Sequence, residues 1–369
     1  MSKRQDGKRL GFKEFLLALF LMIVVWAARD LFGIDSATRD RIVEPEPTGT
    51  VRVMFTSPDP SGAVSPRQGG LHTDLAEAID QAQRSVDVAA FDFDLAQVAE
   101  ALVRAQQRGA AVRLVTDNDY EMELGPTRLR DAQIPVVTDG SPAFMHNKFV
   151  VIDESQVWTG SWNLTENGAY ANDNNVIVVD STKLAENYTA EFEEMFEAGA
   201  FGASSPDLVP HPLIDLHGVL IETHFEAEGN VRDRMVDLIN RAEDSIHFMA
   251  FLFTDDKIAR AIIARHEDGL AVSGVIEARN VAASGSDFER FRKAGVDILE
   301  DGNPYIMHHK VIVIDEAIVI TGSYNFTANA ADNNDENILI LNDPEIAGRY
   351  MEEFERVYQE ALSAKEAGS

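Results

Sequence analysis

Two segments of the chain each place a histidine and a lysine two residues apart, and together these side chains can act on a phosphate ester. His146 and Lys148 form the first pair, and His308 and Lys310 form the second pair 162 residues later. Each pair opens a run of apolar, β-branched residues, which favours a buried strand, and side chains at positions i and i+2 of a strand share one face. Each pair therefore presents an imidazole, able to attack or to transfer a proton, beside an ammonium able to neutralise an anion.

The likeness between the two segments extends beyond these pairs. Comparing His146–Thr165 with His308–Thr327, twelve of twenty positions are identical and no gap is needed. Both copies include a Gly-Ser-x-x-Asn segment at the end of a second predicted strand, which adds a hydroxyl and a carboxamide to the same place. We expect four of these residues to bind the phosphate of a substrate: Ser161, Asn163, Ser323 and Asn325.

Each copy also carries an aspartate between its two predicted strands. Asp153 and Asp315 stand at predicted hairpin turns, a position that aspartate favours because its carboxylate accepts hydrogen bonds from nearby backbone. We therefore predict a structural role for both. His309 points to the opposite face of its strand and is given no chemical role, although that position can line the mouth of the site.

The paired HxKxxxxD segments, each followed by GSxxN, resemble the motifs of the phospholipase D superfamily. That superfamily includes phosphatidyl-transferring lipases, cardiolipin synthases, endonucleases and tyrosyl-DNA phosphodiesterases. The repeat context extends the resemblance over residues 51–362. It implies two halves that pack about a pseudo-twofold axis and bring both histidine–lysine pairs into one cleft, so no oligomer is required to complete the site.

The resemblance also implies a mechanism that uses two histidines. A neutral imidazole attacks phosphorus, an imidazolium protonates the leaving oxygen, and water or an alcohol then releases the phosphohistidine. Lys148 and Lys310 supply the charge that metal ions supply in other phosphodiesterases, so we expect no metal and no other cofactor.

The two copies differ downstream, where superfamily members carry an acidic residue that orients a catalytic histidine. Glu336 stands at this position in the second copy, and Asn174 stands there in the first. We predict that Glu336 reaches across to His146 and supports it as the nucleophile, which leaves His308 as the general acid. Support of His308 by Glu336 within its own half would reverse these roles.

The rest of the sequence predicts the elements that position the motifs. A strand–helix–strand pattern occurs twice, which indicates an α/β fold of two duplicated α/β/α sandwich domains at residues 51–205 and 219–369, with a linker at 206–218. The predicted ranges are Val51–Thr56, Val86–Phe93, Val112–Thr116, Pro135–Thr138, Ile246–Phe253, Val272–Glu277 and Asp297–Leu299 for strands, and Leu71–Arg84, Leu95–Arg108, Tyr188–Phe196, Met235–Glu243, Lys257–His266 and Ile346–Leu362 for helices.

The N-terminus carries a pattern typical of a membrane signal. Residues 1–9 are basic and should stay in the cytoplasm, and residues 10–32 form a hydrophobic helix that is either a membrane anchor or a signal peptide cleaved after Ala27. Residues 33–50 are a predicted tether. Either alternative places the catalytic part outside the cytoplasm, membrane-anchored or secreted.

The composition excludes some kinds of catalytic chemistry but does not identify the substrate. The chain has no cysteine, which excludes disulfides and thiolate catalysis, and its net charge of −30 repels nucleic acid and anionic lipid at long range. The sequence favours a nuclease-like phosphodiesterase, with Trp162, Tyr170, Tyr324 and Phe326 as candidates for stacking on bases. The alternative is a phospholipase or phosphatidyltransferase with an apolar rim at 143–145 and 305–307. A binding module without catalysis is the third hypothesis.

Overall fold

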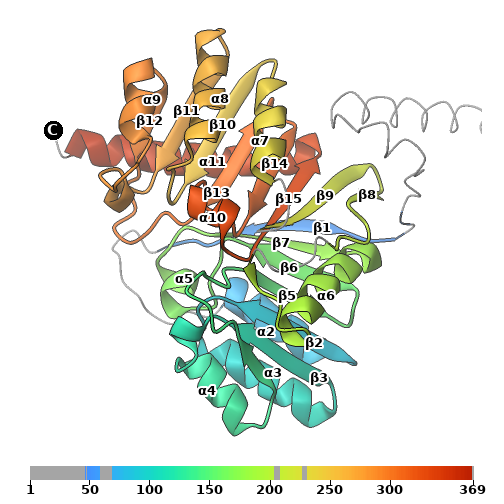
Figure 1. The fold of residues 1–369 in the computed structure, drawn as a ribbon. Coiled ribbons are helices and arrows are strands. Elements are labelled where there is room, and N and C mark those ends of the chain that lie inside the picture. The colour runs from blue at the N-terminus through green and yellow to red at the C-terminus, as the bar shows by residue number, and fades with distance from the viewer. Residues whose placement is uncertain (1–45, 47, 59–68, 203–207, 227–230, 368–369) are drawn as a thin grey trace, which may run out of the picture. The chain divides into compact units, whose positions relative to one another are not determined.

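The structure is a computed structural model that describes residues 46, 48–58, 69–202, 208–226 and 231–367 (Figure 1). The predicted basic segment 1–9 and the predicted hydrophobic helix 10–32 lie outside the described residues, as does most of the tether. Within the described ranges, no helix is both long and apolar enough to cross a membrane. The residues from Glu44 onward form one compact unit.

The first half is built on a mixed seven-stranded sheet with the order β1-β7-β6-β5-β2-β3-β4. Strands β2, β3 and β4 run parallel, as their helical connections require, whereas β5, β6, β7 and β1 pair antiparallel. The strands are β1 (Val51–Phe55), β2 (Ser85–Ala90), β3 (Ala111–Thr116), β4 (Val136–Thr138), β5 (Lys148–Ile152), β6 (Gln156–Gly160) and β7 (Asn175–Asp180). The helices are α2 (Leu71–Gln81), α3 (Ala96–Arg108), α4 (Leu124–Asp131), α5 (Glu166–Tyr170) and α6 (Thr182–Phe196).

The second half repeats this topology with one additional edge strand. Its sheet has the order β12-β11-β10-β13-β14-β15-β9-β8, in which the first seven strands correspond in turn to β4, β3, β2, β5, β6, β7 and β1. This repetition confirms the predicted duplication. The strands are β8 (Leu213–Leu216), β9 (Val219–Glu226), β10 (Ser245–Ala250), β11 (Ala271–Ile276), β12 (Asp297–Glu300), β13 (Lys310–Ile314), β14 (Ile318–Gly322) and β15 (Glu336–Asn342). The helices are α7 (Val231–Asn240), α8 (Asp256–Glu267), α9 (Phe288–Ala294), α10 (Ala328–Asp332) and α11 (Pro344–Ala367).

Several boundaries differ from the sequence prediction, and two of the differences follow directly from contacts in the structure. The predicted linker 206–218 contains β8, which pairs antiparallel with β9 and extends the second sheet. Helix α6 begins at Thr182, well before the predicted start at Tyr188, because Ser181 caps it by accepting a hydrogen bond from the Leu184 amide.

The helices lie on both faces of each sheet. In the first half, α2 and α3 cover one face with a hydrophobic cluster of their own, and α6 covers the other. Helices α6 and α11 belong to a second cluster that also includes residues of both sheets, so the two halves share a core. Burial of this continuous apolar surface is the main force that holds the halves together.

Buried polar contacts between the halves are reciprocal. Asn175 Nδ2 donates to the Tyr350 hydroxyl at 3.0 Å, and the Tyr188 hydroxyl donates to Asn337 Oδ1 at 3.2 Å. Asn175 and Asn337 stand at equivalent positions of the two copies, as do the two tyrosines. A twofold relation between the halves gives this pattern, in which each contact occurs twice with the partners exchanged.

Candidate active site

The backbone of each motif histidine is held by the other half of the molecule. The His146 amide donates to the Asp335 carbonyl at 3.0 Å, and the His308 amide donates to the Asp173 carbonyl at 2.9 Å. Asp173 lies two residues before the start of β7, and Asp335 lies one residue before the start of β15. The two histidines, which lie just before β5 and β13, are therefore both at the interface between the halves.

Both histidines line one cleft of about 690 Å³. The motif asparagines Asn163 and Asn325 line it as well, so the structure brings together four of the predicted site residues. The remaining lining residues include Phe91, Asp92, Asp94, Tyr120, Phe144, Phe251, Leu252, Thr254, Ile306 and Asn334.

His146 contacts a buried carboxylate from the second half. Its Nδ1 lies 2.8 Å from Glu336 Oε2, which is the predicted contact across the halves. Glu336 also accepts hydrogen bonds from the Ser323 hydroxyl at 2.6 Å and from Asn334 Nδ2 at 3.3 Å. Burial raises the pKa of Glu336 to about 8, against the opposing effect of Lys148, Ser323 and Asn334. In its ionised form the carboxylate accepts all three hydrogen bonds, which places the His146 proton on Nδ1 and directs Nε2 to the cleft.

His308 has an equivalent environment in which an amide replaces the carboxylate. Its Nδ1 lies 2.9 Å from the Ser161 carbonyl oxygen and 3.1 Å from Asn174 Oδ1. The Ser161 hydroxyl donates to that same Asn174 oxygen at 3.0 Å. His308 therefore has the same Nδ1–H tautomer as His146, but no negative charge stabilises its protonated form.

Burial and the nearby lysine ammonium groups lower the pKa of both motif imidazoles. Burial lowers the pKa of His146 well below its usual range, and Lys148 and Lys310 lower it further. The same three causes, with a contribution from His146, lower the pKa of His308. Both rings are therefore neutral near pH 7, and a phosphate group bound beside them would raise the pKa of each.

Each motif lysine contacts the backbone of the histidine two residues before it. Lys148 Nζ donates to the His146 carbonyl at 2.8 Å, and Lys310 Nζ donates to the His308 carbonyl at 2.9 Å. Each ammonium also lies 4.9 Å from the centre of a phenylalanine ring, Phe91 or Phe251. Burial lowers the pKa of Lys148 to about 7, against the opposing effect of Glu336 and the aspartates nearby.

The motif serines do not open onto the cleft. Ser161 and Ser323 are fully buried, and their hydroxyls contact Asn174 and Glu336, the two groups that face the histidines. Each hydroxyl also accepts a backbone amide at the start of a strand, that of Asn175 in β7 or that of Asn337 in β15. The serines therefore orient the groups that orient the histidines.

The motif aspartates lie at the hairpin turns, away from the histidines. Asp153 accepts hydrogen bonds from the amides of Gln83, Arg84 and Ser85, at 2.6–3.1 Å, and so holds the loop before β2. Asp315 does the same for the loop before β10. The contacts agree with the predicted structural role.

This role predicts a pH-dependent loss of stability for Asp153→Asn with no loss of turnover per folded molecule. Burial raises the pKa of Asp153, but the three amides lower it by more, so the net shift is downward. Such a carboxylate stabilises the fold above its unfolded pKa, and that stabilisation disappears as the pH falls through the folded pKa. Urea unfolding should show a deficit of about 1–3 kcal/mol at pH 7 that shrinks below about pH 4. A deficit equal at both pH values would contradict the charge-based role.

Several residues that support the site were not predicted. Asp117 and Glu277 follow the equivalent strands β3 and β11, and they accept the amides of Met145 and Met307 at 3.0 and 2.8 Å. They fix the segments from which the histidines project. Their common place after a strand in each copy is the signal that could have revealed them.

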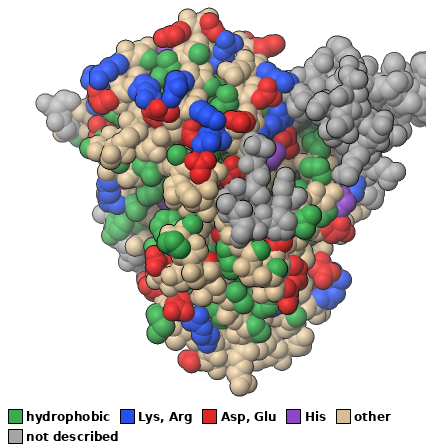
Figure 2. All heavy atoms as spheres, in the orientation of Figure 1, with side chains coloured by type: hydrophobic (Ala, Val, Ile, Leu, Met, Phe, Trp, Pro, Cys, Tyr) green, Lys and Arg blue, Asp and Glu red, His purple; other side chains and the backbone are tan. Residues whose placement is uncertain are grey.

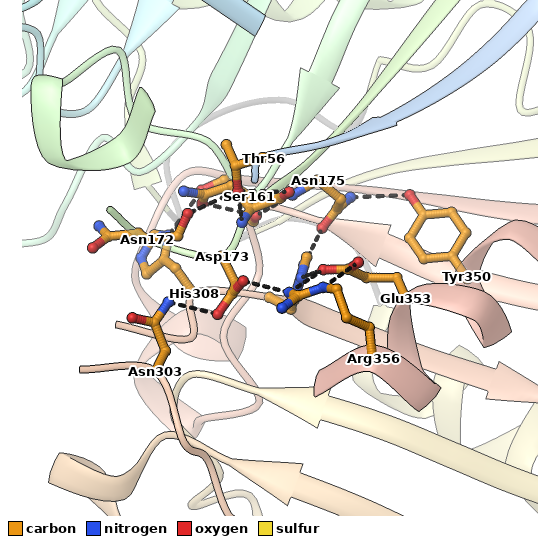
Figure 3. A network of polar contacts seen from close by, with 12 residues as sticks. Thr56, Ser161, Asn172, Asp173, Asn175, Asn303, His308, Tyr350, Glu353 and Arg356 are labelled. Carbon is orange, nitrogen blue, oxygen red and sulfur yellow. Dashed lines mark hydrogen bonds and ion pairs between the residues drawn. The ribbon is translucent and has the colours of Figure 1, made fainter. Parts of the chain in front are cut away.

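The prediction that His309 can line the mouth of the cleft is wrong. His309 is fully buried, with Nε2 3.0 Å from Glu353 and Nδ1 3.2 Å from Asn175 Oδ1. It belongs to the polar contacts between the halves. Figure 3 shows the neighbouring part of these contacts, where Arg356 pairs with both Glu353 and Asp173. Asn147 occupies the equivalent position and contacts Glu191 at 2.8 Å.

The exchange of contacts between the halves predicts that neither half is active alone. A fragment of residues 48–206 lacks Glu336 and the carbonyl that holds the His146 amide, and a fragment of residues 213–369 lacks Asn174 and the carbonyl that holds His308. We expect no turnover from either fragment and partial recovery when the two are mixed. Substantial activity from one fragment, shown to be monomeric by light scattering, would contradict a shared site.

Fold and site together define a protein of two duplicated halves with one two-histidine cleft between them. A family model described as "Cardiolipin synthase, PLD-like domain" matches residues 75–196 and again 235–358. The phospholipase D of Rickettsia felis is 31% identical over 161 residues, which cover 44% of this chain and 80% of that protein. The chain therefore belongs to the phospholipase D superfamily.

Other relatives are similar over a single half. The mitochondrial cardiolipin hydrolase of Xenopus tropicalis is 40% identical over 127 residues, 34% of this chain, and the human protein is 35% identical over the same length. The match spans 60% and 50% of the length of those two proteins. The crystal structure of phosphatidylserine synthase from Haemophilus influenzae has a TM-score of 0.60 at 13% identity, covers 92% of this chain and 90% of its own, and shows the shared fold.

Proposed function

We propose that the protein is a metal-independent phosphodiesterase that forms a phosphohistidine on His146. The observation that carries the proposal is the contact between His146 Nδ1 and the buried Glu336 carboxylate, which His308 lacks. A carboxylate stabilises the positive charge that develops on an imidazole as its other nitrogen bonds to phosphorus. His146 is therefore the better nucleophile.

In the first step, His146 Nε2 forms a bond to phosphorus and the bond from phosphorus to the leaving oxygen breaks. His308 donates a proton to that oxygen. The bound phosphodiester supplies the negative charge that raises the pKa of His308 in the cleft. In the second step, water forms a bond to phosphorus, the nitrogen–phosphorus bond breaks, and His308 takes the proton of the water.

The other motif residues divide between charge stabilisation and positioning. Lys148 and Lys310 neutralise the non-bridging oxygens, and Asn163 and Asn325 donate to them from the cleft wall. We assign positioning roles to Ser161 and Ser323, in place of the predicted phosphate contact, because their hydroxyls are buried against Asn174 and Glu336.

The substrate class that the cleft supports best is a phospholipid. The four aromatic residues that the sequence offered for stacking on bases are all buried in the core: Trp162, Tyr170, Tyr324 and Phe326. Those four residues are therefore not available for base stacking, and the aromatic residues that line the cleft are instead Phe91, Tyr120, Phe144 and Phe251. In the predicted apolar rim, Met145 and Met307 are buried, whereas Phe144 is exposed and Ile306 is half-buried, and these two residues line the cleft.

Charge at the cleft also disfavours a long polyanion. Among the described residues that line it, Asp92 and Asp94 are the acidic ones, and no lysine or arginine is among them. Binding to single-stranded nucleic acid depends on a positively charged groove along the backbone. The sequence favoured a nuclease, and this charge distribution shifts our proposal to the phospholipid alternative. Turnover of phosphatidylcholine and of plasmid DNA, each offered separately, distinguishes the two.

Metal independence predicts that turnover survives chelation. Two lysines can supply the charge of a metal ion, and within the described ranges no group of three or more histidine, aspartate or glutamate residues could hold one. We expect activity within about twofold of the untreated protein in excess EDTA. Loss of turnover in EDTA that Mg²⁺ or Zn²⁺ restores would overturn the mechanism.

We further propose that residues 10–32 anchor the chain in a membrane and that the catalytic part lies outside the cytoplasm. The basic residues before the hydrophobic segment support this orientation. Protease added outside spheroplasts should digest the catalytic part, and protection of that part would contradict the orientation.

A further inference from the structure

Exposed apolar side chains gather beside one edge of the cleft. Four large hydrophobic residues are exposed in the described part of the chain, and three of them lie near the entrance of the first half. Met122, in the loop that leads into α4, is 79% exposed, Leu124, the first residue of α4, is 45% exposed, and Phe144 is 38% exposed. The fourth, Leu208, is 57% exposed and lies before β8. We call Met122, Leu124 and Phe144 the first rim.

Packed aromatic rings connect the first rim to the catalytic residues. The ring centres of Phe144 and Phe91 are 5.3 Å apart, and those of Phe91 and His146 are 4.7 Å apart. Tyr120, two residues before Met122, packs on the same Phe91 ring at 4.7 Å. Phe91, Tyr120 and Phe144 all line the cleft. Phe144 is therefore continuous with the substrate site, and Met122 and Leu124 follow closely in the chain after Tyr120, which lines that site.

The second half has no equivalent of this rim. Its corresponding loop follows the short helix Ala278–Asn280 and contains Ala282, Ala283, Ser284 and Gly285, with no large exposed hydrophobic residue in this described segment. Ile306 stands in place of Phe144 and is half-buried. Because the duplicated halves otherwise share their elements, the apolar loop is a feature of one side alone.

Acidic side chains surround the first rim. Asp119 and Glu123 are exposed in the same loop, Glu121 is half-buried there, and Asp92 lies at the cleft edge. Figure 2 shows acidic and hydrophobic side chains interspersed on one face of the molecule. Such a surface is repelled by an anionic bilayer but suits a zwitterionic one, whose choline or ethanolamine groups carry positive charge outward.

We propose that the first rim docks on a zwitterionic phospholipid surface and places the cleft over the lipid it hydrolyses. The inference rests on the proposed phospholipid substrate and adds the surface through which that substrate is reached. Met122 and Leu124 insert among the headgroups and acyl chain ends, Phe144 lies where the rim meets the cleft, and the carboxylates pair with ammonium groups.

The test compares full-length protein, purified in neutral detergent, on two substrates. One is phosphatidylcholine in mixed micelles, and the other is soluble bis(p-nitrophenyl) phosphate. The double variant Met122→Ser/Leu124→Ser should raise the apparent KM for micellar lipid about tenfold or more, because two apolar side chains no longer leave water. Its turnover of the soluble substrate should equal that of the parent chain, which also shows that it is folded.

Leu208→Ser is the matched control, since it removes an exposed leucine elsewhere and should change neither rate. Glu123→Lys should increase turnover in micelles that contain phosphatidylglycerol relative to micelles of phosphatidylcholine alone. An unchanged KM in the double variant, or an equal rise in Leu208→Ser, would overturn the docking proposal. Hydrolysis of the soluble ester by the parent chain without hydrolysis of any phospholipid would instead refute the phospholipid function, and the rim proposal with it.

Discussion

Replacement of His146 by alanine is expected to abolish turnover of every phosphodiester, whereas His308→Ala should retain activity on substrates with a good leaving group. The first variant loses the atom that bonds to phosphorus, which should reduce kcat by about 10⁴-fold or more. The second loses a proton donor, and p-nitrophenolate leaves without needing a proton. We expect His308→Ala to lose about 10²–10⁴-fold on phosphatidylcholine but much less in the first step with bis(p-nitrophenyl) phosphate.

The covalent intermediate gives a second measurement. In His308→Ala, no group remains to activate the water of the second step, so p-nitrophenyl phosphate should stay attached to His146. A burst of p-nitrophenolate followed by slow turnover, and an adduct in the intact mass spectrum that maps to His146, are the expected signs. Bursts and adducts in His146→Ala, with none in His308→Ala, would show that the two roles are reversed.

Sequence alone was sufficient for the parts of the site that lie on one continuous segment. Side chains two residues apart on a strand share a face, so the pairing of His146 with Lys148 follows from spacing once the strand is recognised. The aspartate turns follow in the same way, since Asp153 needs only the local loop to find its amides. Repetition of the segment then predicted two halves with one topology, and the strand order confirms it.

Contacts between the halves could not be predicted from the spacing of residues along the sequence. Nothing in the spacing of His309 shows that Glu353 and Asn175 will enclose it, because all three meet only after the halves pack. Trp162 and Tyr324 were likewise predicted to stack on bases, but both side chains are buried in the core. Strand β9, in which Glu222 and His224 interrupt the apolar residues, was missed because pairing with β15 and β8 in the folded sheet outweighs the local pattern.

Exchange of the residues at positions 174 and 336 should transfer the nucleophilic role from one histidine to the other. Glu336→Asn alone removes the carboxylate from His146 and is expected to reduce kcat by about 10²–10⁴-fold, as loss of the acid that orients a catalytic histidine does elsewhere. Adding Asn174→Glu places a carboxylate within reach of His308 Nδ1, which now lies 3.1 Å from the Asn174 oxygen.

The first half already contains the groups that hold such a carboxylate. Ser161 would donate to it as Ser323 donates to Glu336, and Asn172 stands at the position from which Asn334 donates in the second half. Thr56 also contacts this place through the Asn174 backbone, so the segment itself is fixed. The replacement keeps the Ser161 contact and moves the charge, but it lengthens the side chain by one methylene and removes the hydrogen bond that Asn174 Nδ2 donates to the Gly168 carbonyl.

The double variant should recover part of the lost rate, and its dependence on the two histidines should invert. In the exchanged background, His308→Ala should abolish turnover of bis(p-nitrophenyl) phosphate, His146→Ala should retain a burst, and the adduct should map to His308. Glu336→Gln serves as the control, because it keeps the size of the side chain and removes the charge alone. Recovery with the adduct still on His146 would show that cleft geometry, rather than the position of the carboxylate, selects the nucleophile.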